Sequence, residues 1–218
     1  MIPKAAAFSW SACLSASLLA ISLPAQADSL FTVPVSGMLQ PQRLDVELQQ
    51  DSGASIDSSN TTRFASASYD WNRYVAVGGI IRLTGDFTAR PTASLQFAPQ
   101  DEPYSFALGI ANVGVRTFRS QPYAVASDTF HNLGNLDAYV GLTHDSDGEH
   151  VMLGTDYPLT HTVAVQADWI GDDGNFFTAG VRWQAVPDFT LSGGFMRANS
   201  HDDGNGVFLA IDKGFRFR

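Results

Sequence analysis

Hydrophobic and polar residues alternate one by one over most of this 218-residue chain. Successive side chains of a β-strand point to opposite faces of a sheet, so a period of two predicts strands with one apolar and one polar face. No segment shows the 3.6-residue period of an amphipathic helix. We predict about twelve strands, separated by turn-forming clusters of Gly, Asp, Asn and Pro, over residues 44–50, 62–71, 74–83, 91–98, 105–117, 123–130, 135–143, 150–157, 162–169, 176–185, 189–196 and 207–217.

The last five predicted strands show most clearly which residues share a face. Even positions there are mostly polar or small, whereas odd positions are mostly apolar. A soluble β-sandwich would also alternate, because its polar face meets water. The apolar odd positions are Val151, Leu153, Val163, Val165, Trp169, Phe177, Val181, Trp183, Leu191, Phe195, Leu209, Ile211, Phe215 and Phe217.

Three features favour a membrane barrel over a soluble sandwich. The polar face carries small residues such as Gly180, Ser192 and Gly194, where a soluble surface usually carries Lys and Glu. Aromatic residues gather at strand ends, as in the interfacial girdles of outer-membrane barrels. The chain also ends on an aromatic-rich segment that includes Phe215 and Phe217. We therefore predict an all-β fold, an antiparallel up-and-down transmembrane β-barrel of about twelve strands, with ten as the alternative count.

An even strand count assigns a side of the membrane to every connection. Single-chain bacterial barrels keep both termini in the periplasm, so alternate connections are periplasmic turns and outer loops. The predicted periplasmic turns are residues 71–73, 98–104, 131–134, 158–161 and 186–188. The predicted outer loops are residues 51–61, 84–90, 118–122, 144–149, 170–175 and 197–206.

The N-terminal residues have the features of a cleaved secretion signal. Lys4 is followed by a mostly small and apolar stretch, and Ala25-Gln26-Ala27 is a cleavage site of the A-x-A type. We predict a signal peptide over 1–27, an irregular lead-in over 28–43 and a single barrel domain over 44–218, located in the outer membrane of a Gram-negative cell. Cys13, the one cysteine, lies in the signal, so the mature chain is expected to lack thiol chemistry.

The charge of the chain excludes one class of partner. Its 13 basic and 22 acidic residues give a formal net charge of −9. Nucleic-acid binding needs a basic footprint, so we expect no nucleic acid partner. The expected partners are outer-membrane lipid, lipopolysaccharide and the barrel-assembly machinery, with a small cation or a polysaccharide as cargo.

The polar face of a barrel lines its interior, and here that face has an excess of acids. If water fills the lumen, such a lining favours cations. The alternative is a closed interior plugged by ion pairs, because twelve strands fall between small filled barrels and open porins of 16 to 18 strands. The predicted lumen residues are Asp45, Glu47, Asp70, Arg82, Arg116, Asp128, Asp137, Asp156, Asp168, Arg182, Asp212 and Arg216.

Acids and histidines also cluster in three predicted outer loops, 144–150, 172–174 and 201–204. Carboxylates at this density can bind Ca²⁺ or bridge lipopolysaccharide through divalent ions. However, Asp, Asn and Gly are also the residues that tight hairpins require, and Asp145-x-Asp147-Gly148 lacks the distal Glu of a calcium loop. We therefore predict turns here, with no metal site and no cofactor.

An outer-membrane hydrolase is the enzymatic alternative. His144 with Asp145, or His201 with Asp202, offers the residue types that activate water. The chain has no Gly-rich phosphate loop, no His-x-x-x-His pair and no G-x-S-x-G motif. We predict no enzymatic activity and no catalytic residue.

Several segments resemble a group of bacterial proteins. The runs 106–114, 123–127, 138–141, 152–159, 167–169 and 171–175 are similar to poorly characterised outer-membrane β-barrel proteins, some of them associated with exopolysaccharide production. The resemblance implies an outer-membrane location and a role in passing or anchoring surface polymer. The predicted function is a porin-like small channel or an accessory to polymer export; the alternative is a closed structural or adhesive barrel.

Overall fold

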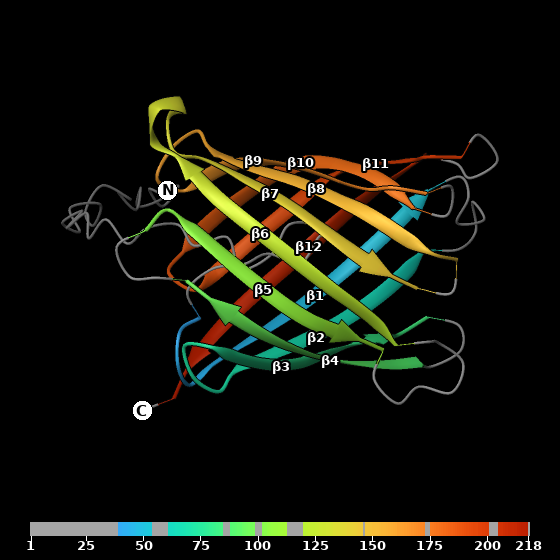
Figure 1. Ribbon diagram of the computed structural model, residues 1–218. Helices are drawn as coiled ribbons and strands as arrows, with labels where there is room; N and C mark the ends of the chain where they lie inside the picture. The colour runs from blue at the N-terminus through green and yellow to red at the C-terminus, as the bar shows by residue number, and fades with distance from the viewer. Residues whose placement is uncertain are drawn as a thin grey trace, which may run out of the picture.

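The chain forms a single closed β-barrel (Figure 1). The computed structural model describes residues 39–53, 61–84, 88–98, 102–112, 120–145, 147–172, 175–200 and 205–217. Each strand pairs antiparallel with its neighbours in sequence, and β1 also pairs with β12, which closes the sheet. The strands are β1 Arg43–Gly53, β2 Thr62–Asp70, β3 Val75–Arg82, β4 Thr88–Phe97, β5 Tyr104–Ala111, β6 Gln121–Phe130, β7 Leu136–His144, β8 Glu149–Pro158, β9 Val163–Ile170, β10 Phe176–Val186, β11 Phe189–Ala198 and β12 Asn205–Arg216.

These twelve strands confirm the predicted all-β, up-and-down barrel. The largest difference is at β5, which ends at Ala111 instead of residue 117, because Asn112 adopts a left-handed φ of 59° that interrupts the extended backbone. A turn of 3₁₀ helix, His131–Leu133, joins β6 to β7. Among the described residues, no helix is long and apolar enough to cross a membrane. The predicted signal peptide and residues 28–38 of the predicted lead-in lie outside the described residues.

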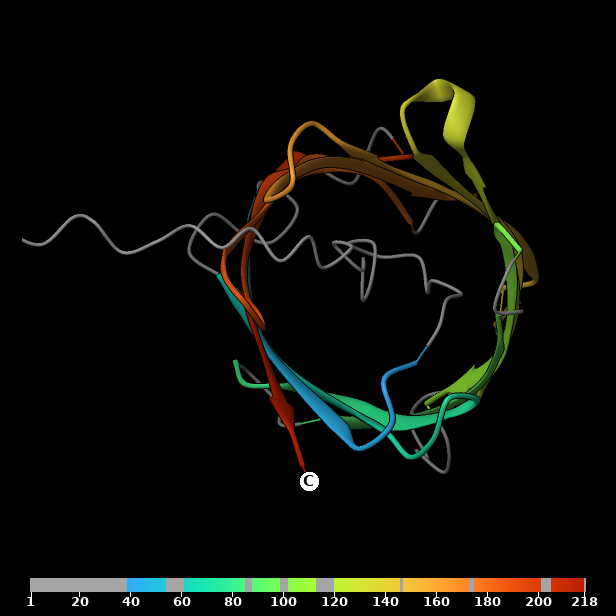
Figure 2. The ribbon, with the colours of Figure 1, turned by 90° about the vertical axis from the view of Figure 1, so that its left-hand side faces the viewer.

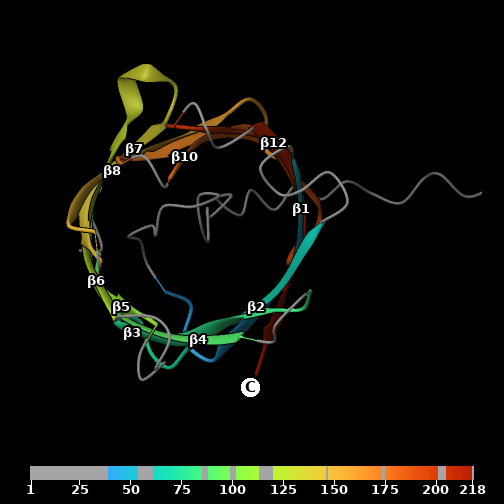
Figure 3. The same ribbon diagram turned by 90° about the vertical axis from the view of Figure 1, so that its right-hand side faces the viewer.

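The two ends of the barrel differ in their connections. β1 starts and β12 ends at the same end, where Arg43 pairs with Arg216. We call this the turn end; it carries the 3₁₀ turn and the two-residue β10–β11 connection, and it lies on the left in Figure 1. We call the opposite end the loop end. Figures 2 and 3 view the barrel along its axis from the turn end and from the loop end.

The strand register separates an inner face from an outer face. Large apolar side chains exposed on the outer face include Leu95, Phe106, Leu108, Leu142 and Leu209. The odd-numbered apolar residues of β8 to β12 all share this face, as predicted from the alternation. An apolar outer band suits contact with lipid.

An ion-pair cluster at the turn end ties the first and last strands together. The buried guanidinium of Arg43 lies 2.7 Å from Asp45 and 3.7 Å from Asp188, and Asp188 also contacts Arg216 at 3.2 Å. Asp188 belongs to the β10–β11 turn, and its carbonyl accepts the N–H of Gly214. The cluster therefore fastens the β1–β12 seam to the next hairpin of the barrel.

Gly214 has no side chain, and the Arg43–Asp45 pair occupies the place where one would lie. A Cβ at this position would lie 2.8 Å from both Arg43 Nη2 and Asp45 Oδ1. We expect Gly214→Ala to displace the Arg43–Asp45 pair and to destabilise the barrel by about 2 kcal/mol, the usual range for overpacking. The measurement is the temperature at which unheated protein loses its anomalous migration on a denaturing gel.

Gly193→Ala is the matched control for this variant. Its added methyl group would face outward and meet the end of the exposed, flexible Leu209 side chain. We expect the transition temperature of this control to stay close to that of the wild type. Equal transition temperatures for the two variants would contradict the role assigned to the seam cluster.

Candidate functional site

The register shows where the predicted lumen residues lie. Ten of the twelve are on the inner face: Asp45, Glu47, Asp70, Arg82, Asp137, Asp156, Asp168, Arg182, Asp212 and Arg216. Arg116 lies outside the described residues.

Asp128 is on the opposite face from the one predicted. It pairs with Tyr104 and Ala138, which belong to the outer face, near the turn end of β6. β6 carries small or apolar residues on both faces, so its alternation does not reveal which face is inside. The prediction placed Asp128 in the lumen because it is charged. A polar side chain at the end of a membrane strand can, however, face outward and reach water.

A buried polar cluster covers the wall formed by β7 to β10. Asp156, only 2% exposed, accepts hydrogen bonds from Arg182 Nη2 at 2.8 Å and from Gln166 Nε2 at 2.7 Å. Asp137 lies directly opposite Asp156 in register and accepts a hydrogen bond from Thr129. Buried charges require such partners, since an unpaired charge is costly away from water. This part of the lumen wall is therefore a mutually bonded network.

Thr178 and Asp168 form a second buried polar pair nearer the loop end. The Thr178 hydroxyl donates to Asp168, and both side chains are almost completely buried. Beside this network, the inner face is apolar: Val125, Tyr139 and Met152 pack together. Sequence reasoning missed this apolar patch, although Tyr139 and Met152 share the parity of Asp137 and Asp156. The wall from β6 to β10 thus has a filled, well-packed surface.

The wall around β1 is different because it carries a ladder of acids. Asp45, Glu47 and Asp51 all face inward along β1. The neighbours opposite Asp45 are Gly214 and Ser68, which are small. We call Asp45, Glu47 and Asp51 the acidic ladder. It runs along one side of the lumen from the turn end toward the loop end.

One further acid lies beside the ladder. Asp212 of β12 lies directly opposite Glu47 of β1, so two carboxylates face each other across the seam. Sequence reasoning placed Asp51 in a loop and overlooked the inward-facing Arg43 and Arg90. The parity of Asp51 with Asp45 and Glu47 was the signal that could have identified it.

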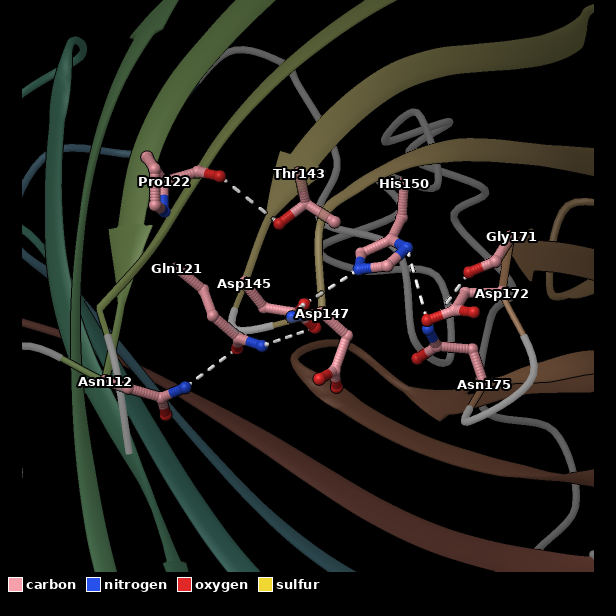
Figure 4. Close-up of polar contacts among 10 residues, drawn as sticks. All are labelled: Asn112, Gln121, Pro122, Thr143, Asp145, Asp147, His150, Gly171, Asp172 and Asn175. Atoms are coloured by element: carbon pink, nitrogen blue, oxygen red, sulfur yellow. Dashed lines mark hydrogen bonds and ion pairs between the residues drawn. The ribbon is translucent and has the colours of Figure 1, made fainter. Parts of the chain in front are cut away.

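A chain of polar contacts crosses the inner wall at the loop end (Figure 4). Asn112 Nδ2 donates to Gln121 Oε1 at 2.7 Å, and Gln121 Nε2 reaches Asp145 Oδ2 at 3.4 Å. Asp145 Oδ1 lies 2.8 Å from His150 Nε2, and His150 Nδ1 faces Asp172 Oδ2 at 3.5 Å. The chain of contacts therefore links β6 and β8 to the connections that follow β5, β7 and β9.

Asp145 is held in its charged form by its neighbours. Burial alone would raise its pKa, but hydrogen bonds from His150 and from the backbone N–H of Asp147 outweigh burial and lower the pKa of Asp145. The predicted partner of Asp145 was His144. His144 instead pairs in register with Glu149 on the outer face, and His201 and Asp202 lie outside the described residues.

The geometry of His150 does not suit water activation or metal binding. Each ring nitrogen faces a carboxylate, so neither is presented to a substrate. The two carboxylates lie at opposite ring nitrogens and cannot share one ion with the imidazole. In the described part of the chain, no group of three or more His, Cys, Asp or Glu residues could hold a metal ion.

Asn199 anchors the segment that carries Asp172. Its side-chain amide donates to the carbonyls of Ile170 and Asp172, both at 2.7 Å, and its Oδ1 accepts the indole N–H of Trp169. This residue follows β11 and fixes the end of β9 from a neighbouring hairpin. Sequence reasoning did not identify Asn199, because its partners are about 30 residues away in the chain.

Comparison with known proteins places this barrel among porins by fold. No protein-family model and no curated protein matches the chain. The KdgM porin is similar with a TM-score of 0.63 at 8% identity, over 79% of this chain and 99% of that chain. The same porin in complex with disordered oligogalacturonate gives a TM-score of 0.61 at 8% identity, over 80% and 99%.

One further similar structure is an outer membrane protein of Acinetobacter baumannii. The Acinetobacter baumannii outer membrane protein Omp33 has a TM-score of 0.50 at 13% identity, over 82% of this chain and all of that chain. At these identities the likeness establishes the fold alone. The chain is therefore a porin-like, twelve-stranded barrel with the fold of outer-membrane proteins.

The paired charges in the filled wall give a testable expectation. Asp156→Asn would leave the Arg182 guanidinium without its carboxylate in a buried place, which should destabilise the barrel by about 3 kcal/mol. The measurement is the urea midpoint of unfolding in detergent. The control Asp128→Asn removes the same charge from the outer face, and we expect its midpoint to match the wild type. An unchanged midpoint for Asp156→Asn would show that this pair contributes little.

Proposed function

We propose that this chain is a non-enzymatic outer-membrane channel that passes small solutes and favours cations. The acidic ladder of β1 is the observation that carries the proposal. Asp45, Glu47 and Asp51 extend along one wall, and Asp212 adds a carboxylate beside Glu47. A wall of one charge sign raises the local concentration of the opposite ion.

The balance of charges over the inner face supports the same preference. Basic residues are fewer than acids, and three of the arginines form ion pairs with carboxylates: Arg43 with Asp45, Arg182 with Asp156 and Arg216 with Asp188. The inward acids are Asp45, Glu47, Asp51, Asp70, Asp137, Asp156, Asp168 and Asp212, and the inward arginines of the described strands are Arg43, Arg82, Arg90, Arg182 and Arg216. The excess of acids makes the lumen attractive to cations.

The exposed apolar outer face supports insertion among lipid and lipopolysaccharide. In this arrangement the turn end faces the periplasm and the loop end faces outward, after assembly by the barrel-assembly machinery. A second candidate cargo is a surface polysaccharide. One porin of similar fold was solved in complex with disordered oligogalacturonate, and this complex is the support for a saccharide as the second candidate cargo.

The competing function is a closed structural or adhesive barrel. The packed patch of Val125, Tyr139 and Met152 and the buried Asp156 favour it, because they fill part of the wall. The small side chains beside Asp45 and Glu47, namely Ser66, Ser68 and Gly214, favour the channel instead. Conductance distinguishes the two functions.

Removing charge from the ladder should reduce ion selectivity. We expect wild-type protein in planar bilayers to give single-channel steps with a cation-selective reversal potential under a salt gradient. The double variant Glu47→Gln/Asp212→Asn should lose at least about half of the cation-to-anion permeability ratio. The wild-type preference should also fade near 1 M salt, where screening acts over about 3 Å.

Asp128→Asn is the matched control, because it removes a charge from the outer face. Its selectivity should equal that of the wild type. Folded protein that gives no conductance steps would support the closed barrel instead. Cation selectivity that persists unchanged in the double variant would show that the acidic ladder does not set it.

A further inference from the structure

The side chain of His150 is buried between two carboxylates that belong to different connections. His150 is only 5% exposed to solvent. Nε2 lies 2.8 Å from Asp145, which follows β7, and Nδ1 lies 3.5 Å from Asp172, which follows β9 (Figure 4). A single imidazole thus joins two segments that are separated by the hairpin of β8 and β9.

This arrangement requires a specific protonation state. A neutral imidazole has one N–H and one lone pair, whereas the imidazolium has two N–H donors. A carboxylate is an acceptor only, so both contacts become hydrogen bonds only when His150 carries the second proton. Histidine is also the side chain whose charge changes between about pH 5 and 8.

We propose that His150 acts as a proton-dependent clasp at the loop end of the barrel. By clasp we mean the pair of contacts through which its imidazole links Asp145 to Asp172. When protonated, it binds Asp145 and Asp172 together and stabilises the described arrangement of the loop end. When deprotonated, it keeps one contact and releases the other. The two connections that carry Asp145 and Asp172 are therefore held together more firmly in mildly acidic medium than in mildly alkaline medium.

The contact with Asp172 is the one that is lost. The Nε2 contact with Asp145 is shorter by 0.7 Å (2.8 Å against 3.5 Å), so the remaining proton of the neutral ring stays on Nε2. The Asp172 side chain is 38% exposed and can be hydrated once released. The backbone of Asp172 has a φ of 92°, which is strained for a residue with a side chain. This strain favours a change of backbone conformation at Asp172 after release.

The described strands next to His150 place no other titratable side chain in contact with its imidazole, so the proposed pH response of the clasp is attributed to His150. Neighbouring strands contribute neutral side chains: Thr143 lies opposite on β7, Gln121 comes from β6, and Ile170 ends β9. Asp168, the next titratable residue on the inner face of β9, is engaged by Thr178. Among the described residues, the carboxylates in contact with His150 are those of Asp145 and Asp172.

The direction of the pH dependence follows from these charges. Raising the pH removes the imidazolium proton and weakens the clasp. Lowering the pH leaves the clasp intact until the carboxylates are protonated, and the lowered pKa of Asp145 delays that loss to stronger acid. The clasp is thus closed while the imidazolium and both carboxylates carry their charges.

Amide hydrogen exchange of the folded full-length barrel in detergent micelles tests the proposal without relying on conduction. After correction for the intrinsic pH dependence of exchange, protection of peptides that cover 170–176 should fall by about two- to fivefold between pH 5.5 and pH 8, which is the contribution of a partly exposed ion pair. In His150→Gln this pH dependence should disappear, because glutamine does not titrate.

His161→Gln is the control, since His161 is exposed in the β8–β9 connection at the turn end, and it should retain the wild-type response. If His150→Gln does not fold, Asp172→Asn serves in its place and should also lose the response. Protection that is independent of pH in the wild type, or that responds equally in His150→Gln, would overturn the clasp. Neither result depends on whether the barrel conducts ions.

Discussion

The antiparallel pairing of β1 with β12 closes the sheet and removes its two open edges. Inside a bilayer no water is present to satisfy backbone N–H and C=O groups, so a sheet can cross only when it has no open edge. The seam runs in register from Arg43 opposite Arg216 to Gly53 opposite Gly206. Arg43 and Asp188 reinforce it at the turn end. Closure then forces every inward side chain into one shared interior.

That shared interior has two unlike walls. On β7 to β10, Asp156, Arg182 and Gln166 bond to one another and are shielded from solvent. On β1, Asp45 pairs with Arg43, and Glu47 lies opposite Asp212 and Ser66, so carboxylates are concentrated along that wall. A bonded wall contributes stability, whereas a wall lined by carboxylates contributes an electrostatic field. The proposed cation preference depends on the second wall.

The loop end is organised by contacts between distant segments. His150 and Asn199 each hold neighbouring connections, and both act on the segment that includes Asp172. The interaction of Asp145 with His150, in place of the adjacent His144, follows from the faces of β7 and β8: His150 points into the barrel and His144 points away. Proton binding at His150 would therefore affect two connections at once.

Alternation along the chain predicts about twelve strands and the two faces of β8 to β12, because each strand displays this local property on its own. It could not assign Asp128, whose strand is small or apolar on both faces. It also could not show that Glu47 faces Asp212 or that His150 lies between two carboxylates. These are relations between strands, and only the register of the closed barrel decides them, since pairing places residues far apart in the chain side by side.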